Sequence, residues 1–149
     1  MEKNEALKQK ALDFLRKNVL SVVATVTADS KPNAATVLYY VDDDLNFYFV
    51  TRRQTRKFAN MSTNRHVAVV VGVGDMPGTI QMEGEAELME EGLEHFMKQL
   101  EQHEQLLQLY FGPFTHIQGL DFAIFKVRID WFRLESMEKD TLQIEEFSR

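Results

Sequence analysis

The 149-residue sequence contains no cysteine, and this absence excludes several kinds of chemistry at once. Disulfide bonds, thiolate metal sites and nucleophilic catalysis by cysteine all require a thiol. Proline and glycine are also scarce, with 3 and 7 residues, and no stretch has the composition of a flexible linker. We therefore expect a single domain over residues 1–149.

Long apolar runs and an excess of positive charge are missing as well. No run approaches the roughly 18 apolar residues that a membrane span needs. The N-terminal decapeptide MEKNEALKQK lacks the apolar core of a signal peptide. The net charge is −6, whereas a general nucleic-acid binder needs a basic face for the phosphate backbone. We expect a cytoplasmic protein whose partners include neither a membrane nor a nucleic acid.

The sequence contains no self-contained catalytic set and no recognisable metal site. The histidines are His66, His95, His103 and His116. None of them forms the i, i+4 pair of a helical metal site, and no serine lies in a G-x-S-x-G elbow. Gly72, Gly74 and Gly78 lack the G-x-G-x-x-G spacing of a nucleotide loop and favour a hairpin loop instead. We expect no catalytic residue in the chain itself, so a bound cofactor would have to supply the chemistry.

Alternating apolar and polar residues predict β-strands along most of the chain. The predicted strands cover residues 19–27, 33–41, 45–50, 67–73, 79–88 and 122–134, with a further short one near 142–147. Short turns between the first three strands require antiparallel pairing, because a parallel pair needs a crossover of roughly a dozen residues. The valine-rich strand 67–73 predicts burial on both faces, and Gly84 predicts a bulge. In the last strand one face is predicted to carry Ala123, Phe125, Val127, Ile129 and Trp131.

Helical periodicity is confined to three places. A first helix is predicted over residues 2–17 and another over 89–109, where Leu93, Phe96, Met97, Leu100 and Leu107 share one side. One or two helical turns are predicted after residue 51, with Phe58 and Met61 on the apolar side. Antiparallel strands with helices at these positions indicate a mainly β protein, a small β-barrel with peripheral helices.

The densest chemical signal is a basic cluster in the short helical segment. Its members are Arg52, Arg53, Arg56 and Lys57. Thr51 and Gln54 have the spacing of a capping box. The first amides of a helix are unpaired and favour an anion, and neighbouring Arg and Lys side chains would complete a phosphate pocket. The alternative is a solvated basic turn whose side chains pair with some of the 23 acidic residues.

The order of these elements resembles the pyridoxamine 5'-phosphate oxidase-like proteins, which are FMN-binding split barrels. The resemblance covers residues 5–90 well and the last strand loosely. Its local signature is Thr51, then Thr55-Arg56-Lys57, then Asn64. The resemblance implies an antiparallel split β-barrel that binds FMN and forms a homodimer, with each flavin held between two subunits. It also implies a flavin-dependent oxidoreductase that acts on a small-molecule substrate.

The same resemblance implies roles for individual residues. Arg56 and Lys57 would grip the flavin phosphate. Val50 and Thr51 would line the ribityl and ring region. The residues along the isoalloxazine would be Thr36, Val37 and Leu38, and a polar residue of the later hairpin strand, Thr79 or Gln81, would reach the flavin.

Three positions and the tail depart from the pattern of true pyridoxamine phosphate oxidases. Ala35, Tyr40 and Leu45 stand where those enzymes carry basic residues, and the tail TLQIEEFSR lacks their Arg-His substrate motif. The general-stress and flavin-reductase-like branches therefore fit better. Three alternatives stay open: a non-catalytic flavin carrier or sensor, a deazaflavin binder, and a haem binder with His66 or His116 as axial ligand.

Overall fold

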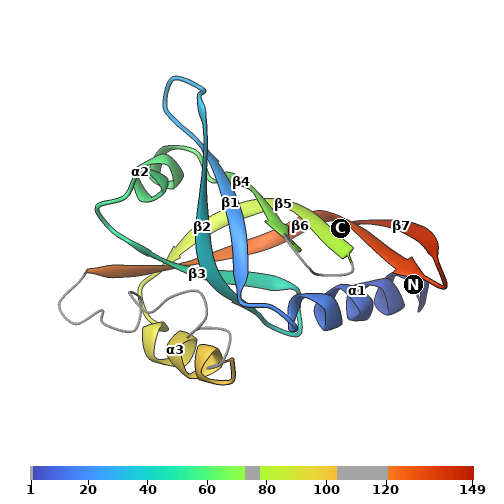
Figure 1. The fold of residues 1–149 in the computed structure, drawn as a ribbon. Coiled ribbons are helices and arrows are strands. Elements are labelled where there is room, and N and C mark those ends of the chain that lie inside the picture. Colours follow the sequence, from blue (N-terminus) through green and yellow to red (C-terminus); the bar gives the residue numbers. More distant parts are fainter. Residues whose placement is uncertain (1, 73–77, 104–120) are drawn as a thin grey trace.

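A computed structural model of the chain describes residues 2–72, 78–103 and 121–149 (Figure 1). In chain order the elements are α1 (Glu2–Leu15), β1 (Leu20–Val26), β2 (Pro32–Val41), β3 (Asn46–Arg52), α2 (Arg56–Thr63), β4 (His66–Val71), β5 (Gly78–Met89), α3 (Leu93–Glu101), β6 (Phe122–Glu138) and β7 (Thr141–Ser148). The predicted strands are all present. Residues 74–77 of the predicted hairpin loop and the end of the helix predicted to 109 lie outside the described residues.

The strands form one antiparallel sheet in the order β3-β2-β1-β4-β5-β6-β7, and β3 also pairs with β6. This additional pairing closes β1 to β6 into a barrel. The far part of β6 extends beyond β3 and pairs with β7 instead. The prediction of an antiparallel barrel with peripheral helices is confirmed. Within the described ranges, no helix combines the length and the apolar composition required to cross a membrane.

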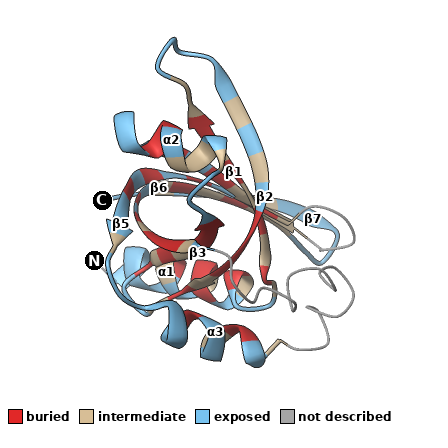
Figure 2. Cartoon of the chain, turned by 90° about the vertical axis from the view of Figure 1, so that its left-hand side faces the viewer, coloured by how far each residue is buried: buried red, intermediate tan, exposed pale blue. Residues whose placement is uncertain are grey.

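Aromatic side chains fill the barrel interior, because strand alternation turns every second residue inward. The rings of Phe49 and Phe125 stack there with their centroids 5.6 Å apart. The apolar side of α1 packs against the same core through Leu12 and Leu15. Figure 2 shows buried residues in the strands and on the helices, while the tip of the β1–β2 hairpin is exposed.

Tyr39 and Tyr40 point to opposite faces of β2, because neighbouring side chains alternate along a strand. Tyr39 lies inside the barrel and its hydroxyl donates a hydrogen bond to the Leu15 carbonyl at 2.6 Å. Tyr40 lies outside, stacked on Tyr48 with ring centroids 4.7 Å apart and covered by Phe96 of α3. Outside the barrel a second buried group, here called the α3 cluster, contains Val19, Leu38, Val50, Phe96, Leu100 and Ile124.

The predicted apolar side of α3 is only partly buried. Phe96 and Leu100 are covered, whereas the exposed fractions of Leu93 and Met97 are 42% and 43%. Among the described residues of α3, Phe96 and Leu100 alone pack into the α3 cluster. Leu107, predicted on the same side, lies outside the described residues.

The bulge predicted at Gly84 is confirmed. Glu83 pairs with Trp131, but Gly84 pairs with Ile129, so β6 contains one extra residue at this point. The strands approach so closely that a Cβ atom on Gly84 would lie 2.1 Å from the Arg128 carbonyl oxygen. Only glycine fits this contact without a shift of the backbone.

The bulge also overturns one prediction. Trp131 was expected to share the inward face with Ile129, but the extra residue, Asp130, reverses the alternation. Phe132 therefore points into the core, fully buried, while Trp131 is half-buried on the outer face.

The prediction that strand 67–73 is buried on both faces is wrong for the single chain. Val67, Val69 and Val71 of β4 are buried, whereas Ala68 is exposed and Val70 is half-buried. The cause is that the barrel core covers only the inner face. The outer face of β4 is therefore apolar without a covering element among the described residues.

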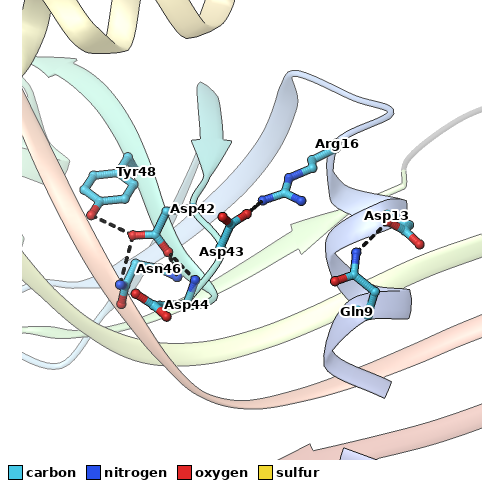
Figure 3. Close-up of polar contacts among 8 residues, drawn as sticks. All are labelled: Gln9, Asp13, Arg16, Asp42, Asp43, Asp44, Asn46 and Tyr48. Carbon is cyan, nitrogen blue, oxygen red and sulfur yellow. Dashed lines mark hydrogen bonds and ion pairs between the residues drawn. The ribbon is translucent and has the colours of Figure 1, made fainter. Parts of the chain in front are cut away.

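The turn between β2 and β3 is organised by one carboxylate (Figure 3). Asp42 accepts hydrogen bonds from the Asn46 amide nitrogen, the Tyr48 hydroxyl and the Asp44 amide nitrogen at 2.9 to 3.0 Å. Burial alone would raise the pKa of Asp42, but these hydrogen bonds outweigh it and lower the pKa below its usual value. Leu45 completes the turn with a left-handed backbone (φ 61°) and a fully buried side chain.

Candidate functional site

The barrel is split between β2 and β3. These strands share only three residue pairs, from Tyr39 with Phe49 to Val41 with Phe47, and then diverge. Beyond that point β2 remains paired with β1, and β3 remains paired with β6. We call the gap between residues 32–38 of β2 and residues 50–52 of β3 the split. Helix α2 follows β3 and lies beside the β1–β2 hairpin (Figure 1).

The β2 side of the split is an open strand edge. The Tyr39 amide donates to the Val19 carbonyl at 3.0 Å, toward β1. Because main-chain groups alternate along a strand, those of Leu38 and Thr36 face the split, where no described strand pairs with them. Such an edge offers hydrogen-bond donors and acceptors to a planar polar ligand.

The predicted capping box is wrong. Helix α2 begins at Arg56, and its N-cap is Thr55, whose hydroxyl accepts a hydrogen bond from the Phe58 amide at 3.3 Å. Thr51 belongs to β3, which pairs with β6 as far as Arg52 and so delays the start of the helix. The Thr51 hydroxyl lies 3.0 Å from that of Thr55.

The basic cluster is almost free of acidic partners. Arg53 is paired with Asp121 at 3.1 Å. No carboxylate among the described residues lies within ion-pair distance of Arg52, Arg56 or Lys57. The alternative stated above, a solvated basic turn whose side chains pair with acidic residues, therefore applies only to Arg53 among these four residues.

Lys57 is a half-buried cation beside another cation. Burial lowers its pKa, and the positive charge of Arg52 lowers it further. The amides of Arg56 and Lys57, in the first turn of α2, have no protein acceptor in the described chain. Free amides, a helix N-terminus and uncompensated cations together favour a bound anion.

A pocket of about 340 Å³ lies beside these cations, between α2 and the β1–β2 hairpin. Its lining consists of Val23, Thr25, Pro32, Asn33, Ala34, Ala35, Arg56 and Lys57. Arg56 and Lys57 stand on one side, and the polar side chains of Thr25 and Asn33 stand on the strand side. The pocket therefore combines positive charge with neutral hydrogen-bonding groups, which suits a phosphate ester.

Five of the predicted cofactor residues lie on the two strands that border the split, and two line the pocket next to it. The five are Thr36, Val37, Leu38, Val50 and Thr51, and the two are Arg56 and Lys57. The Thr36 side chain is exposed, but Val37 is buried in the barrel core, and Leu38 and Val50 are buried in the α3 cluster. A ligand in the split can contact those three only through the main chain.

Thr79 and Gln81 lie elsewhere on the same chain. Across the sheet, Thr36 pairs with Val22, Val22 with Val70, and Val70 with Gln81. Gln81 is thus three strand spacings from Thr36, roughly 14 Å along the outer face. Thr79 is half-buried and its hydroxyl donates to the main chain of β4 at 3.1 Å. The split of one chain does not include these two residues.

Sequence reasoning missed Asn60, which is buried in α2. Its Nδ2 donates to the Thr25 hydroxyl at 2.9 Å and to Asn33 Oδ1 at 3.0 Å. The available signal was a polar residue next to the apolar Met61 and one helical turn after Lys57.

Of the two histidines considered as haem ligands, the structure describes only His66. His66 is exposed on β4, 3.9 Å from Glu85, and is not among the residues that border the split. His116 lies outside the described residues. No group of three or more potential metal-ligating side chains occurs in the described part of the chain.

The comparisons with known proteins agree with this fold. The family model described as Pyridoxamine 5'-phosphate oxidase matches residues 7–135. The pyridoxine/pyridoxamine 5'-phosphate oxidase of Salinibacter ruber is 34% identical over 76 residues, which are 50% of this chain and 35% of that protein. The match therefore spans about a third of that relative's length.

Solved structures share the fold at low sequence identity. General Stress Protein 26 from Bacillus anthracis is 19% identical with a TM-score of 0.67, over 96% of this chain and 98% of that one. A heme binding protein from Mycobacterium smegmatis is 14% identical with a TM-score of 0.63, over 93% of this chain and 57% of that one.

Proposed function

The chain belongs to the pyridoxamine 5'-phosphate oxidase-like family, and on this premise we propose that it binds FMN in the split and acts as a flavin-dependent oxidoreductase. Proteins of this family are commonly flavin oxidoreductases. The observation that carries the proposal is the pair Arg56 and Lys57, which lacks carboxylate partners in the described chain and lines a pocket next to an open strand edge.

The residues of the split fit the parts of FMN in order. Arg56 and Lys57 hold the phosphate, and the free amides at the start of α2 add hydrogen bonds. The main-chain edge at Thr36 and Leu38 bonds the polar rim of the ring. When bound, the flavin supplies the electron-transfer chemistry, while the chain binds, orients and shields it.

A second copy of the chain completes this proposed site. Thr79 and Gln81 are too far across the sheet to reach a flavin at the Thr36 edge of their own chain. The outer face between them carries half-buried Val22 and Val70, which a partner would cover. We propose a homodimer in which each flavin takes its phosphate grip from one subunit and Thr79 or Gln81 from the other.

Vitamin phosphate is a poor candidate for the substrate. In true pyridoxamine phosphate oxidases basic residues stand at the positions of Ala35, Tyr40 and Leu45. Here Ala35 lines the anion pocket, Tyr40 is packed under α3, and Leu45 is fully buried in the β2–β3 turn. None of the three presents a cation to a substrate phosphate, which favours a different small molecule.

The first test is spectroscopic. FMN added to the purified protein should lose its free fluorescence on binding, and riboflavin, which lacks the phosphate, should bind more weakly. A nicotinamide donor under air should then be consumed if the protein is an enzyme, whereas tight binding without turnover indicates a carrier. Titration with a deazaflavin tests the related cofactor. Failure to bind FMN overturns the proposal.

The second test addresses the dimer. Chains with Arg56→Ala and Lys57→Ala are mixed with chains that carry Gln81→Ala, and the dimers are allowed to exchange. If each site draws on two subunits, half of the sites in a mixed dimer are intact and half carry both defects. FMN affinity should then return to the wild-type value in one site per mixed dimer. No recovery, or monomers at micromolar concentration, contradicts the shared site.

A further inference from the structure

A buried amide joins the basic helix to the strands that face it across the anion pocket. Asn60, 7% exposed, donates to Thr25 of β1 at 2.9 Å and to Asn33 of β2 at 3.0 Å. Thr25 and Asn33 are cross-strand partners. One side chain of α2 therefore binds both strands of the hairpin at a single level.

The position of Asn60 in the helix links this contact to the anion pocket. Asn60 follows Arg56 by four residues and Lys57 by three, so all three side chains lie on neighbouring parts of one helix face. Thr25 and Asn33, which accept the bonds from Asn60, also line the pocket with Arg56 and Lys57. The Asn60 amide thus fixes the rotation of α2 relative to Thr25 and Asn33, which line the pocket on the side opposite Arg56 and Lys57.

The helix has apolar contacts with the barrel in addition to the bonds of Asn60. Met61 is buried in the core, and the ring of Phe58 packs edge-on against Phe125 with centroids 5.7 Å apart. Apolar contacts fix where the helix lies but are non-directional, whereas hydrogen bonds fix its rotation. Loss of the amide should therefore change the aim of Lys57 more than the folding of the chain.

We propose that Asn60 is a positioning residue for phosphate binding, which holds Lys57 and Arg56 in the pocket through its bonds to Thr25 and Asn33. This role rests on the FMN site proposed above. It is specific to the phosphate end of the ligand, because Asn60 borders neither the Thr36 edge nor β5.

The test compares FMN with riboflavin in the full-length protein. Asn60→Leu keeps a similar volume and removes both bonds, and should weaken FMN about tenfold. Riboflavin affinity should stay at the wild-type value, since riboflavin has no phosphate to misalign. Ser62→Ala, an exposed change in the same helix, is the matched control and should alter neither affinity. An equal loss for both ligands indicates a structural role and overturns the proposal, as does an unchanged FMN affinity.

A change on the strand side guards against a folding defect of Asn60→Leu. Thr25→Val removes one acceptor with little change of shape and should reproduce part of the FMN-selective loss. Combined with Asn60→Leu it should add little, because both changes break one contact. Fully additive losses contradict the proposal. If wild-type protein binds FMN no better than riboflavin, the phosphate site itself is refuted; if wild type discriminates and Asn60→Leu does so equally, only the role of Asn60 is refuted.

Discussion

Two seams of the barrel differ in almost every respect. Between β5 and β6 the strands pair from Gly78 with Ser136 to Met89 with Ile124, with one bulge, and the contact is so close that Gly84 has no room for a side chain. Between β2 and β3 pairing stops after three residue pairs, and the space beyond is bordered by cations without acidic partners among the described residues.

The closed seam between β5 and β6 holds the barrel together, whereas the open seam between β2 and β3 has groups available for a ligand. A continuous ladder satisfies its main-chain groups internally and leaves nothing for a ligand. At the open seam the main-chain groups of Thr36 and Leu38 have no strand partner among the described residues, and Lys57 has no acidic partner there. In the proposed site these groups would bind the FMN. Changes at the closed seam between β5 and β6 should therefore alter mainly stability, and changes at the open seam between β2 and β3 should alter mainly binding.

The largest expected effect is on binding at the open seam. Arg56→Ala with Lys57→Ala removes charge-assisted hydrogen bonds of about 1.5–3 kcal/mol each, so FMN affinity should fall at least ~100-fold. Fluorescence titration measures the loss, and riboflavin affinity should change much less. Lys10→Ala, which removes a lysine paired with Glu145 and Glu138, is the control and should leave FMN binding unchanged. A double variant with wild-type FMN affinity would refute the phosphate site.

The closed seam should respond in stability. Gly84→Ala places a methyl group where the Arg128 carbonyl lies, so the backbone must move, at the upper end of the roughly 1–3 kcal/mol that overpacking costs. Urea denaturation should show the loss, and Glu87→Ala, an exposed change on the same strand, should show almost none. FMN affinity of the folded fraction should be unchanged. A marked loss of affinity would mean that the two seams are not independent.

The closed seam was the easier one to predict from sequence. The alternation between residues 79 and 88 predicted the strand, and Gly84 predicted the bulge, because both are local signals. The reversal of Trp131 was missed because the position of the extra residue depends on the partner strand. The buried outer face predicted for β4 is also missing in the single chain, since alternation says which faces are apolar but not what covers them.

The open seam was predicted only in part. The basic cluster and the resemblance indicated Arg56 and Lys57, but no local pattern shows where β2 and β3 separate. The capping box at Thr51 failed because pairing with β6 extends β3 to Arg52, a tertiary effect that overrides the local motif. Asn60 escaped notice because its partners, Thr25 and Asn33, lie far away in sequence.

A smaller effect should appear in the stability of the ligand-free protein. Lys57→Met removes a half-buried cation that has another cation beside it, so it should stabilise the folded state by on the order of 1 kcal/mol. Lys10→Met removes a cation whose pKa is raised by its bond to Glu145, and should destabilise by at most about 1 kcal/mol, because the pair is partly exposed. Urea denaturation without FMN tests both. Destabilisation by Lys57→Met would show that its charge is compensated in the free protein.

The smallest and most specific effect should be the pH dependence of the stability differences between wild type and the Lys57→Met and Lys10→Met variants. The folded-state pKa of Lys57 lies below its ordinary value of 10.5. The unfolded chain therefore holds this proton over a range where the folded chain has released it, so stability rises with pH there. The stability advantage of Lys57→Met should be complete at pH 7 and shrink as the pH rises through the lowered pKa toward 10.5.

The folded-state pKa of Lys10 is raised, so the stabilisation by Lys10 is complete below pH 10.5 and is lost only above it. Urea denaturation of both variants between pH 7 and 10 tests this. The difference in unfolding free energy from wild type should shrink for Lys57→Met and stay constant for Lys10→Met. A constant gap for Lys57→Met would mean that the lost side-chain charge is not what changes stability, and that the open seam is not strained by its own cations.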